Sequence, residues 1–197
     1  MNYFSKVPYG LLAVLAVGVS LYSLHYFIFG ATYAPPGISI NFLNRPTAFL
    51  LHVGGGLVAL GTGVWQFLPR TRKSRWHRYS GRIYVLACLI GGIGGLAIAP
   101  YSTAGPIAQS GFTVLAVVWI LTTLKAYGTA QRRDFTAHRI WMWRSFGLTA
   151  AAITLRLYLP VGQILGFDFL PLYQFTAWAC WLTSLAIAEG TRRWIDR

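Results

Sequence analysis

Acidic residues and cysteines are both scarce in this sequence. Asp and Glu together number 4, against 17 Lys and Arg, and charged residues of either sign make up only 11% of the chain. The two cysteines, Cys88 and Cys180, form no C-x-x-C pair, which argues against thiol redox chemistry and against a zinc ribbon. The glycine cluster at 91–95 is not followed by the Lys-Ser or Lys-Thr of a phosphate-binding loop, so no nucleotide site is predicted.

Hydrophobic residues make up 55% of the chain, and a composition this apolar excludes a soluble basic domain. The net charge of +13 would otherwise suggest a nucleic-acid-binding protein. The basic residues instead lie between long apolar stretches, where they determine membrane topology and meet anionic lipid headgroups. We therefore predict membrane lipids as partners and no nucleic acid.

Six apolar stretches are each long enough to cross a hydrocarbon core about 30 Å thick. They cover residues 8–30, 47–68, 82–100, 107–127, 140–159 and 172–190. The first stretch is too long for the core of a signal peptide and lacks an A-x-A cleavage site, so we expect it to remain in the mature protein. The sequence predicts an all-α, single-domain bundle of six transmembrane helices over residues 1–197.

Lys and Arg residues concentrate on one side of this predicted bundle. That side carries Lys6, Arg70, Arg72, Lys73, Arg75, Arg78, Arg82, Lys125, Arg132, Arg133, Arg139, Arg192, Arg193 and Arg197. The loops on the opposite side hold only Arg45. Cytoplasmic loops are enriched in Lys and Arg, so both chain termini are predicted to be cytoplasmic.

The four histidines fall into two predicted pairs near opposite membrane faces. His25 and His52 lie close to the outer ends of the first two stretches, whereas His77 and His138 lie at the inner boundary. Two imidazoles at one level can provide the axial ligands of a b-type haem. A haem near each face would carry electrons across the bilayer. The alternative is that these histidines only contact headgroups, with His25 placed at the interface beside Tyr26.

Small and basic residues accompany the histidines. Gly55, Gly56 and Ala59 share the helical face of His52, where they would leave room for a porphyrin. The glycines of the second and third stretches also predict close packing between those two helices. Near the inner pair stand cations that could bind haem propionates, namely Arg78, Arg82, Arg139 and Arg144.

The fifth stretch carries two arginines at membrane depth, Arg144 and Arg156. Arg156 follows His138 by 18 residues, five helical turns, so the two share a face near opposite surfaces. Glu189 is the one acid within a stretch, and its pairing with Arg144 would fix helix packing. The alternative is an inner polar pocket that accepts a quinone headgroup, a haem propionate or a lipid phosphate. Its predicted members are His77, Arg78, His138, Arg144 and Glu189, of which all but Arg78 are expected to cluster, with His77 and His138 as ligands of haem iron.

Four segments carry a resemblance to a known family. They are FLLHVGGGLVALGTGVWQF, WHRYSGRIYV, AHRIWMWRS and ITLRLYLP. Together they resemble a bacterial membrane protein family, domain of unknown function 2306, over about residues 47–190. The resemblance implies a polytopic bundle in the bacterial inner membrane rather than a particular reaction. The family's histidines map onto His52, His77 and His138 and its arginines onto Arg78, Arg82, Arg139, Arg144 and Arg156, whereas His25 is outside the pattern.

A looser likeness exists to the transmembrane b-type cytochromes, which place histidine pairs on four core helices. Here the stretch 107–127 has no histidine, so the pattern differs. The favoured function is membrane electron transfer with bound haem b or quinone. The alternative is an accessory or assembly subunit of a larger membrane complex that holds lipid or cofactor in its inner pocket. A transporter is disfavoured, because no pair of broken helices in inverted repeats is evident.

Overall fold

The computed structural model describes residues 3–32, 36–67 and 74–195, and within these ranges every regular element is a helix. The longer helices are α1 (Tyr3–Ser23), α4 (Pro46–Gly63), α5 (Arg75–Ile98), α6 (Pro106–Gln131), α7 (Phe135–Thr149), α8 (Ala151–Ile164) and α9 (Phe169–Ile195). Shorter ones are α2 (His25–Phe29), α3 (Pro36–Asn44) and the 3-10 helices η1 (Val64–Phe67) and η2 (Ala99–Tyr101). Arg70, Arg72, Lys73 and Arg197 of the predicted basic side lie outside the described residues.

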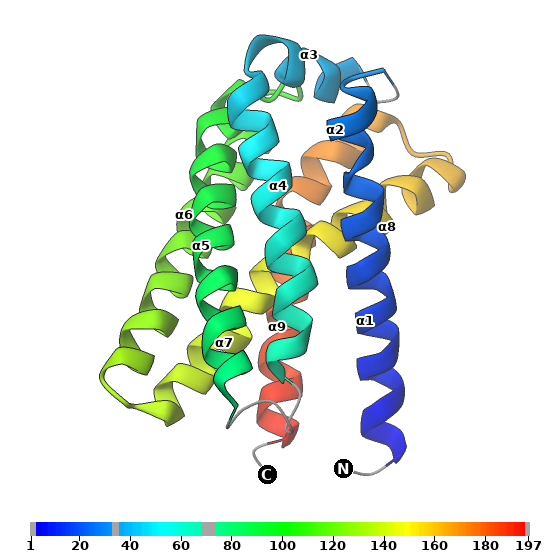
Figure 1. Cartoon of the computed structure of the whole chain (residues 1–197). Coiled ribbons are helices and arrows are strands. Elements are labelled where there is room, and N and C mark those ends of the chain that lie inside the picture. The colour runs from blue at the N-terminus through cyan, green and yellow to red at the C-terminus, as the bar shows by residue number, and fades with distance from the viewer. Residues whose placement is uncertain (1–2, 33–35, 68–73, 196–197) are drawn as a thin grey trace.

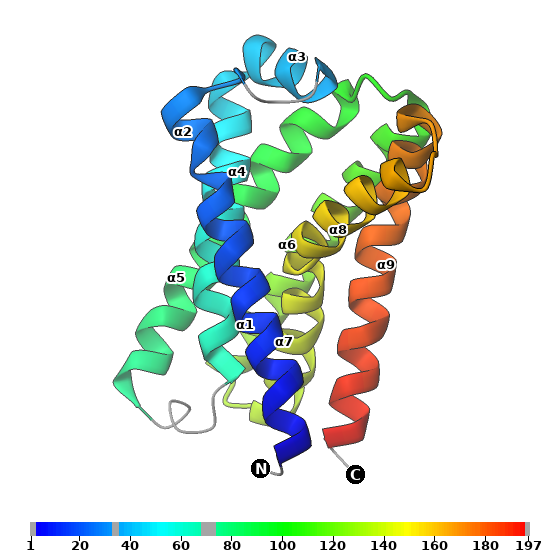
Figure 2. The same cartoon turned by 90° about the vertical axis from the view of Figure 1, so that its right-hand side faces the viewer.

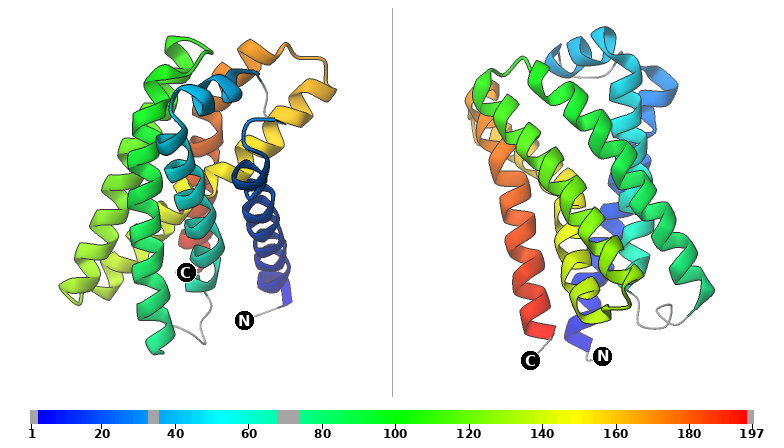
Figure 3. Two further views of the ribbon diagram at one scale, coloured as in Figure 1. Left: turned by 45° about the horizontal axis from the view of Figure 1, so that its top comes forward. Right: turned by 90° about the vertical axis from the view of Figure 1, so that its left-hand side faces the viewer.

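The helices form one upright bundle. α3 lies across one end of it, and the start of α1 and the end of α9 lie together at the other (Figures 1 and 2). α4 packs along α5, while α1 stands against α4 and α8 (Figure 3). The chain thus returns to the end at which it began.

Five segments are long and apolar enough to cross a membrane, and this agrees with a membrane protein built from several apolar helices. They are Tyr9–Phe29, Pro46–Phe67, Arg75–Tyr101, Pro106–Gln131 and Phe135–Ile164. α9 has 27 residues, enough length to span, but its Trp, Tyr, Gln and Thr residues lower its mean hydropathy. The sixth span therefore stays a prediction.

Helix boundaries differ from the predicted ones where polar residues begin a helix. α5 starts seven residues before the predicted span, because the Ser74 hydroxyl accepts a hydrogen bond from the backbone N–H of His77 at 3.2 Å. Asp134 caps α7 in the same way by accepting from Ala137 N–H at 3.0 Å. His77 and His138 consequently belong to the first turns of two long helices. Residues 36–44, which lie between the first two predicted spans, form the short helix α3.

Glycines bring α4 and α5 into backbone contact, which confirms the predicted packing of these helices. A Cβ added to Gly55 would lie 2.5 Å from Gly91 Cα, and one added to Gly94 would lie 2.6 Å from Ala48 O. Only residues without side chains permit this approach. Gly92 differs, since its added Cβ would meet Ile120 on α6 at 2.5 Å.

Buried hydroxyl groups link α5, α6 and α7 at the centre. The Tyr84 hydroxyl lies 2.8 Å from Ser145 Oγ and 3.0 Å from Thr149 Oγ1. Trp119 Nε1 donates to Thr149 Oγ1 at 2.9 Å, and Thr123 Oγ1 lies 2.7 Å from Ser145 Oγ. Within this network each hydroxyl and indole N–H has a hydrogen-bond partner although it is buried from water. The network therefore holds the three helices in one register.

Candidate ligand-binding cavities

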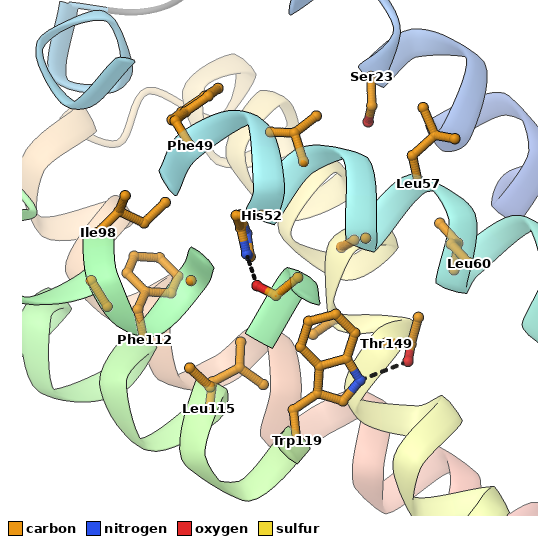
Figure 4. A pocket seen from close by; sticks show the side chains of 18 of the residues that line it. Ser23, Phe49, His52, Leu57, Leu60, Ile98, Phe112, Leu115, Trp119 and Thr149 are labelled. Atoms are coloured by element: carbon orange, nitrogen blue, oxygen red, sulfur yellow. Dashed lines mark hydrogen bonds between the residues drawn. The ribbon is translucent and has the colours of Figure 1, made fainter. Parts of the chain in front are cut away.

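One cavity of about 220 Å³ lies in the half of the bundle nearer α3. We call it the His52 cavity. Its wall is mostly apolar and includes Leu57, Leu60, Phe112, Leu115 and Trp119 (Figure 4). Its polar lining includes Ser20, Ser23, Tyr26, Asn41, His52, Thr149, Arg156 and Tyr173. An apolar cavity with a few converging polar groups is the usual form of a small-molecule site.

His52 is held in one orientation inside this cavity. Its Nδ1 lies 2.9 Å from the carbonyl oxygen of Gly91 (Figure 4). A carbonyl oxygen only accepts, so Nδ1 carries the proton and the neutral ring presents Nε2 as an acceptor. The ring rests on Gly95, where an added Cβ would come within 2.8 Å of Nδ1. Two glycines of α5 therefore position the imidazole.

Arg156 enters the same cavity from α8. Its guanidinium donates to Ala152 O at 3.1 Å and to Ser23 Oγ at 3.2 Å, and it lies 5.9 Å from the ring of Tyr22. Among the residues that the structure describes, no carboxylate pairs with it. A guanidinium has five N–H donors, so this cation retains hydrogen-bonding capacity toward the cavity.

Three further side chains of the His52 cavity went unnoticed in the sequence. The hydroxyls of Tyr26 and Tyr173 and the amide of Asn41 line the cavity, and none of them makes a hydrogen bond to another residue that the structure describes. Tyr26 comes from α2, which follows α1, and Asn41 comes from α3, which lies across the end of the bundle. No local pattern marks these residues, because their meeting depends on that arrangement.

The predicted outer pair, His25 and His52, does not share this cavity. His25 does not line it, and its Nδ1 instead lies 2.6 Å from Tyr22 O with its ring centroid 3.8 Å from that of Tyr26. Ser23 and Tyr26 line the cavity at helical spacing, so His25, two residues beyond Ser23, lies on another face of this helix. The prediction of a haem held by this pair is therefore not supported by the arrangement.

His77 and His138 do line one pocket, at the opposite end of the bundle. This His77 pocket measures about 470 Å³, and Gln66, Phe67, Phe135, Thr136, Arg139 and Met142 complete its wall. Nδ1 of His138 lies 2.8 Å from the carbonyl oxygen of Ala126, which only accepts, so Nδ1 donates and the ring is held in one orientation. Arg78 and Arg82 are exposed on α5 and do not line the pocket, whereas Arg139 does.

Arg144 and Glu189 do not join the two histidines, so the predicted four-residue cluster is wrong in this part. Arg144 stands six residues beyond His138, which directs it to another side of α7. There Arg144 forms an ion pair with Glu189 of α9, and Arg192 binds the same carboxylate at 2.8 Å. The predicted ion pair between Arg144 and Glu189 is therefore present and links α7 to α9.

The family comparison agrees with these features. The model of a family described as predicted membrane protein (DUF2306) matches residues 49–191, from α4 through most of α9. His52, His77, His138 and Arg156 all lie within the matched region, and α1 to α3 lie before it. No curated protein and no solved structure matches the chain. Since the match covers most of the sequence, the chain belongs to the DUF2306 family of membrane proteins.

Proposed function

We propose that this membrane protein binds the headgroup of a lipid-soluble quinone in the His52 cavity and takes part in membrane electron transfer. The observation that carries the proposal is the convergence of His52 and Arg156 on one apolar cavity. Arg156 supplies a donor for a quinone carbonyl oxygen. His52 Nε2 supplies an acceptor for the hydroxyl of the reduced form.

The size of the cavity fits a single ring rather than a larger cofactor. At about 220 Å³ it is smaller than a drug-sized site, which typically occupies roughly 300–1,000 Å³. A porphyrin with its propionates would not fit there. The isoprenoid tail of the quinone would pass between the helices into the surrounding lipid. The apolar wall of the cavity would contact the quinone ring, and its few polar side chains would bind the ring oxygens.

Removing the Arg156 donor tests the quinone site. Arg156→Gln should weaken the binding of a short-chain quinone to purified protein by at least about tenfold, since a hydrogen bond to a charged group contributes about 1.5–3 kcal/mol. Arg82→Gln, which removes the same charge from an exposed position of α5, should bind like the wild type. Calorimetric titration in detergent measures both. Equal affinities in the two variants would contradict the site.

A haem b at the His77 pocket is the second part of the proposed electron path. Two imidazoles on one pocket, one of them oriented by a backbone carbonyl, suit axial ligation, and Arg139 stands beside them to bind a propionate. Electrons would then pass between a quinone near one face and a haem near the other.

A reduced-minus-oxidised optical spectrum tests the haem. Protein expressed with ample haem should show a b-type band that both His77→Ala and His138→Ala abolish, because each removes one axial ligand. His25→Ala should keep the band, as His25 does not line this pocket. A colourless wild-type protein would contradict the proposed haem but would leave the proposed quinone site untested.

A second candidate is an accessory subunit that holds a lipid in the His52 cavity within a larger membrane complex. The absence of a carboxylate partner for Arg156 among the described residues favours it, because a lipid phosphate or a fatty-acid carboxylate would neutralise that cation. Mass spectrometry of molecules extracted from purified protein separates the two. A retained quinone favours the first candidate and a retained phospholipid the second.

The proposed setting is the bacterial inner membrane, with six spans and both termini in the cytoplasm. The start of α1 and the end of α9 lie at the same end of the bundle (Figure 1), which supports an even number of membrane crossings. The basic residues Arg75, Lys125, Arg132 and Arg133 lie toward that same end. A reporter fused after Arg197 should be active only in its cytoplasmic form, and periplasmic activity would reverse the orientation.

A further inference from the structure

A cluster of cations gathers at the ends of α6, α7 and α9, apart from both cavities. It comprises Lys125, Arg144, Arg192 and Arg193, together with Trp141 and Glu189. Among the residues that the structure describes, Glu189 is the carboxylate of this cluster; Arg144 and Arg192 bind it, and Arg193 approaches it at 4.0 Å. Lys125 and Arg193 are both exposed, and neither has a carboxylate partner of its own among those residues, so the cluster attracts a further anion.

Trp141 orders two of these cations. The Lys125 ammonium and the Arg144 guanidinium each lie 4.6 Å from the centre of its ring. A cation held over an indole face has lost part of its freedom before any ligand arrives. The guanidinium of Arg193 stays 4.0 Å from Glu189 and presents paired N–H donors that match the oxygens of a phosphate. The cluster is thus arranged in advance for a phosphate group.

The position of the cluster in the bundle indicates which kind of molecule carries the phosphate. The cluster lies about two helical turns from the end of the bundle where α7 begins and α9 ends (Figure 1). In the topology proposed above, that end meets the lipid headgroups of the cytoplasmic face. Leu121 precedes Lys125 by one turn on α6, shares its face and is exposed, which provides an apolar surface for an acyl chain. We infer that this cluster binds the phosphate of an anionic phospholipid.

The test measures phosphatidylglycerol retained by the protein after release from phosphatidylcholine vesicles that contain it as a minor component. Wild type should keep phosphatidylglycerol in preference to phosphatidylcholine in native mass spectra. Lys125→Gln with Arg193→Gln should lower retention by about tenfold, as each cation near the surface strengthens anionic lipid binding. Both positions are exposed, so the Arg144–Glu189–Arg192 pairing that supports the fold remains, and unchanged melting checks this.

Arg132→Gln with Arg133→Gln is the matched control. It removes two exposed charges at the end of α6 without touching Trp141 or Glu189. Equal loss in the two double variants would overturn the proposal, because it would show a general surface potential rather than a site. Displacement of phosphatidylglycerol by an equal concentration of inorganic phosphate would also overturn it, since free phosphate would then be the ligand.

Discussion

Replacing Gly55 by Leu should lower the free energy of unfolding by about 3 kcal/mol or more, the upper part of the usual range for overpacking. The added Cβ alone would come within 2.5 Å of Gly91 Cα and 2.6 Å of Ala87 O. Those atoms belong to the backbone of α5, which cannot move aside as a flexible side chain would. α4 and α5 must therefore separate. Thermal unfolding followed by circular dichroism in detergent measures the loss.

The neighbouring glycine supplies the control. A Cβ added to Gly56 meets nothing within 4 Å, because Gly56 faces the His52 cavity. Gly56→Ala should keep or slightly raise the melting temperature, since Gly is less favourable than Ala in a helix by roughly 1 kcal/mol. Equal destabilisation by Gly55→Leu and Gly56→Ala would mean that α4 and α5 do not pack as described.

Gly56→Leu should abolish quinone binding while the protein stays folded. The leucine side chain would extend into the His52 cavity that the proposed headgroup needs, and its Cβ would meet nothing within 4 Å. We expect affinity for a short-chain quinone to fall at least about a hundredfold, a loss of about 2.8 kcal/mol. Titration of the variant beside Gly18→Leu, whose added Cβ also meets nothing within 4 Å and which does not line the cavity, gives the comparison. Undiminished binding by Gly56→Leu would place the quinone elsewhere.

The main features of the bundle could be predicted from local pattern. Long apolar runs predict helices because each backbone group must be satisfied within the membrane, and glycines such as Gly55 predict close packing because nothing else allows it. His77 and His138 were expected at one level because both begin helices that run in the same direction. The structure places them in one pocket.

The His52 cavity could be predicted only in part. His52 and Arg156 stand out as polar residues at membrane depth, but Tyr173 and Asn41 do not, because loops and helix ends commonly carry such side chains. Their convergence depends on two features that periodicity does not reveal. One is the fold-over of α3, and the other is the change of direction at Ala150, where ψ is −9° and α7 gives way to α8.

The errors for His25 and Arg144 have a common cause. Each residue was assigned a partner from its expected depth in the membrane. The partner is in fact determined by the face of the helix on which the side chain lies. His25 leaves the helix on a different face from the cavity-lining Ser23 and Tyr26, and Arg144, six residues beyond His138, leaves α7 toward Glu189. Depth alone therefore predicts the level of a residue but not its neighbours.

Photolabelling of the protein in membranes with a photoreactive quinone tests the central claim most directly. The quinone site predicts labelled peptides from α4, α6 and α8, including those that contain His52, Trp119 and Arg156. An excess of unlabelled short-chain quinone should suppress this labelling, and Gly56→Leu should eliminate it. Labelling confined to lipid-facing surfaces, or insensitive to competitor, would contradict a quinone site in the His52 cavity.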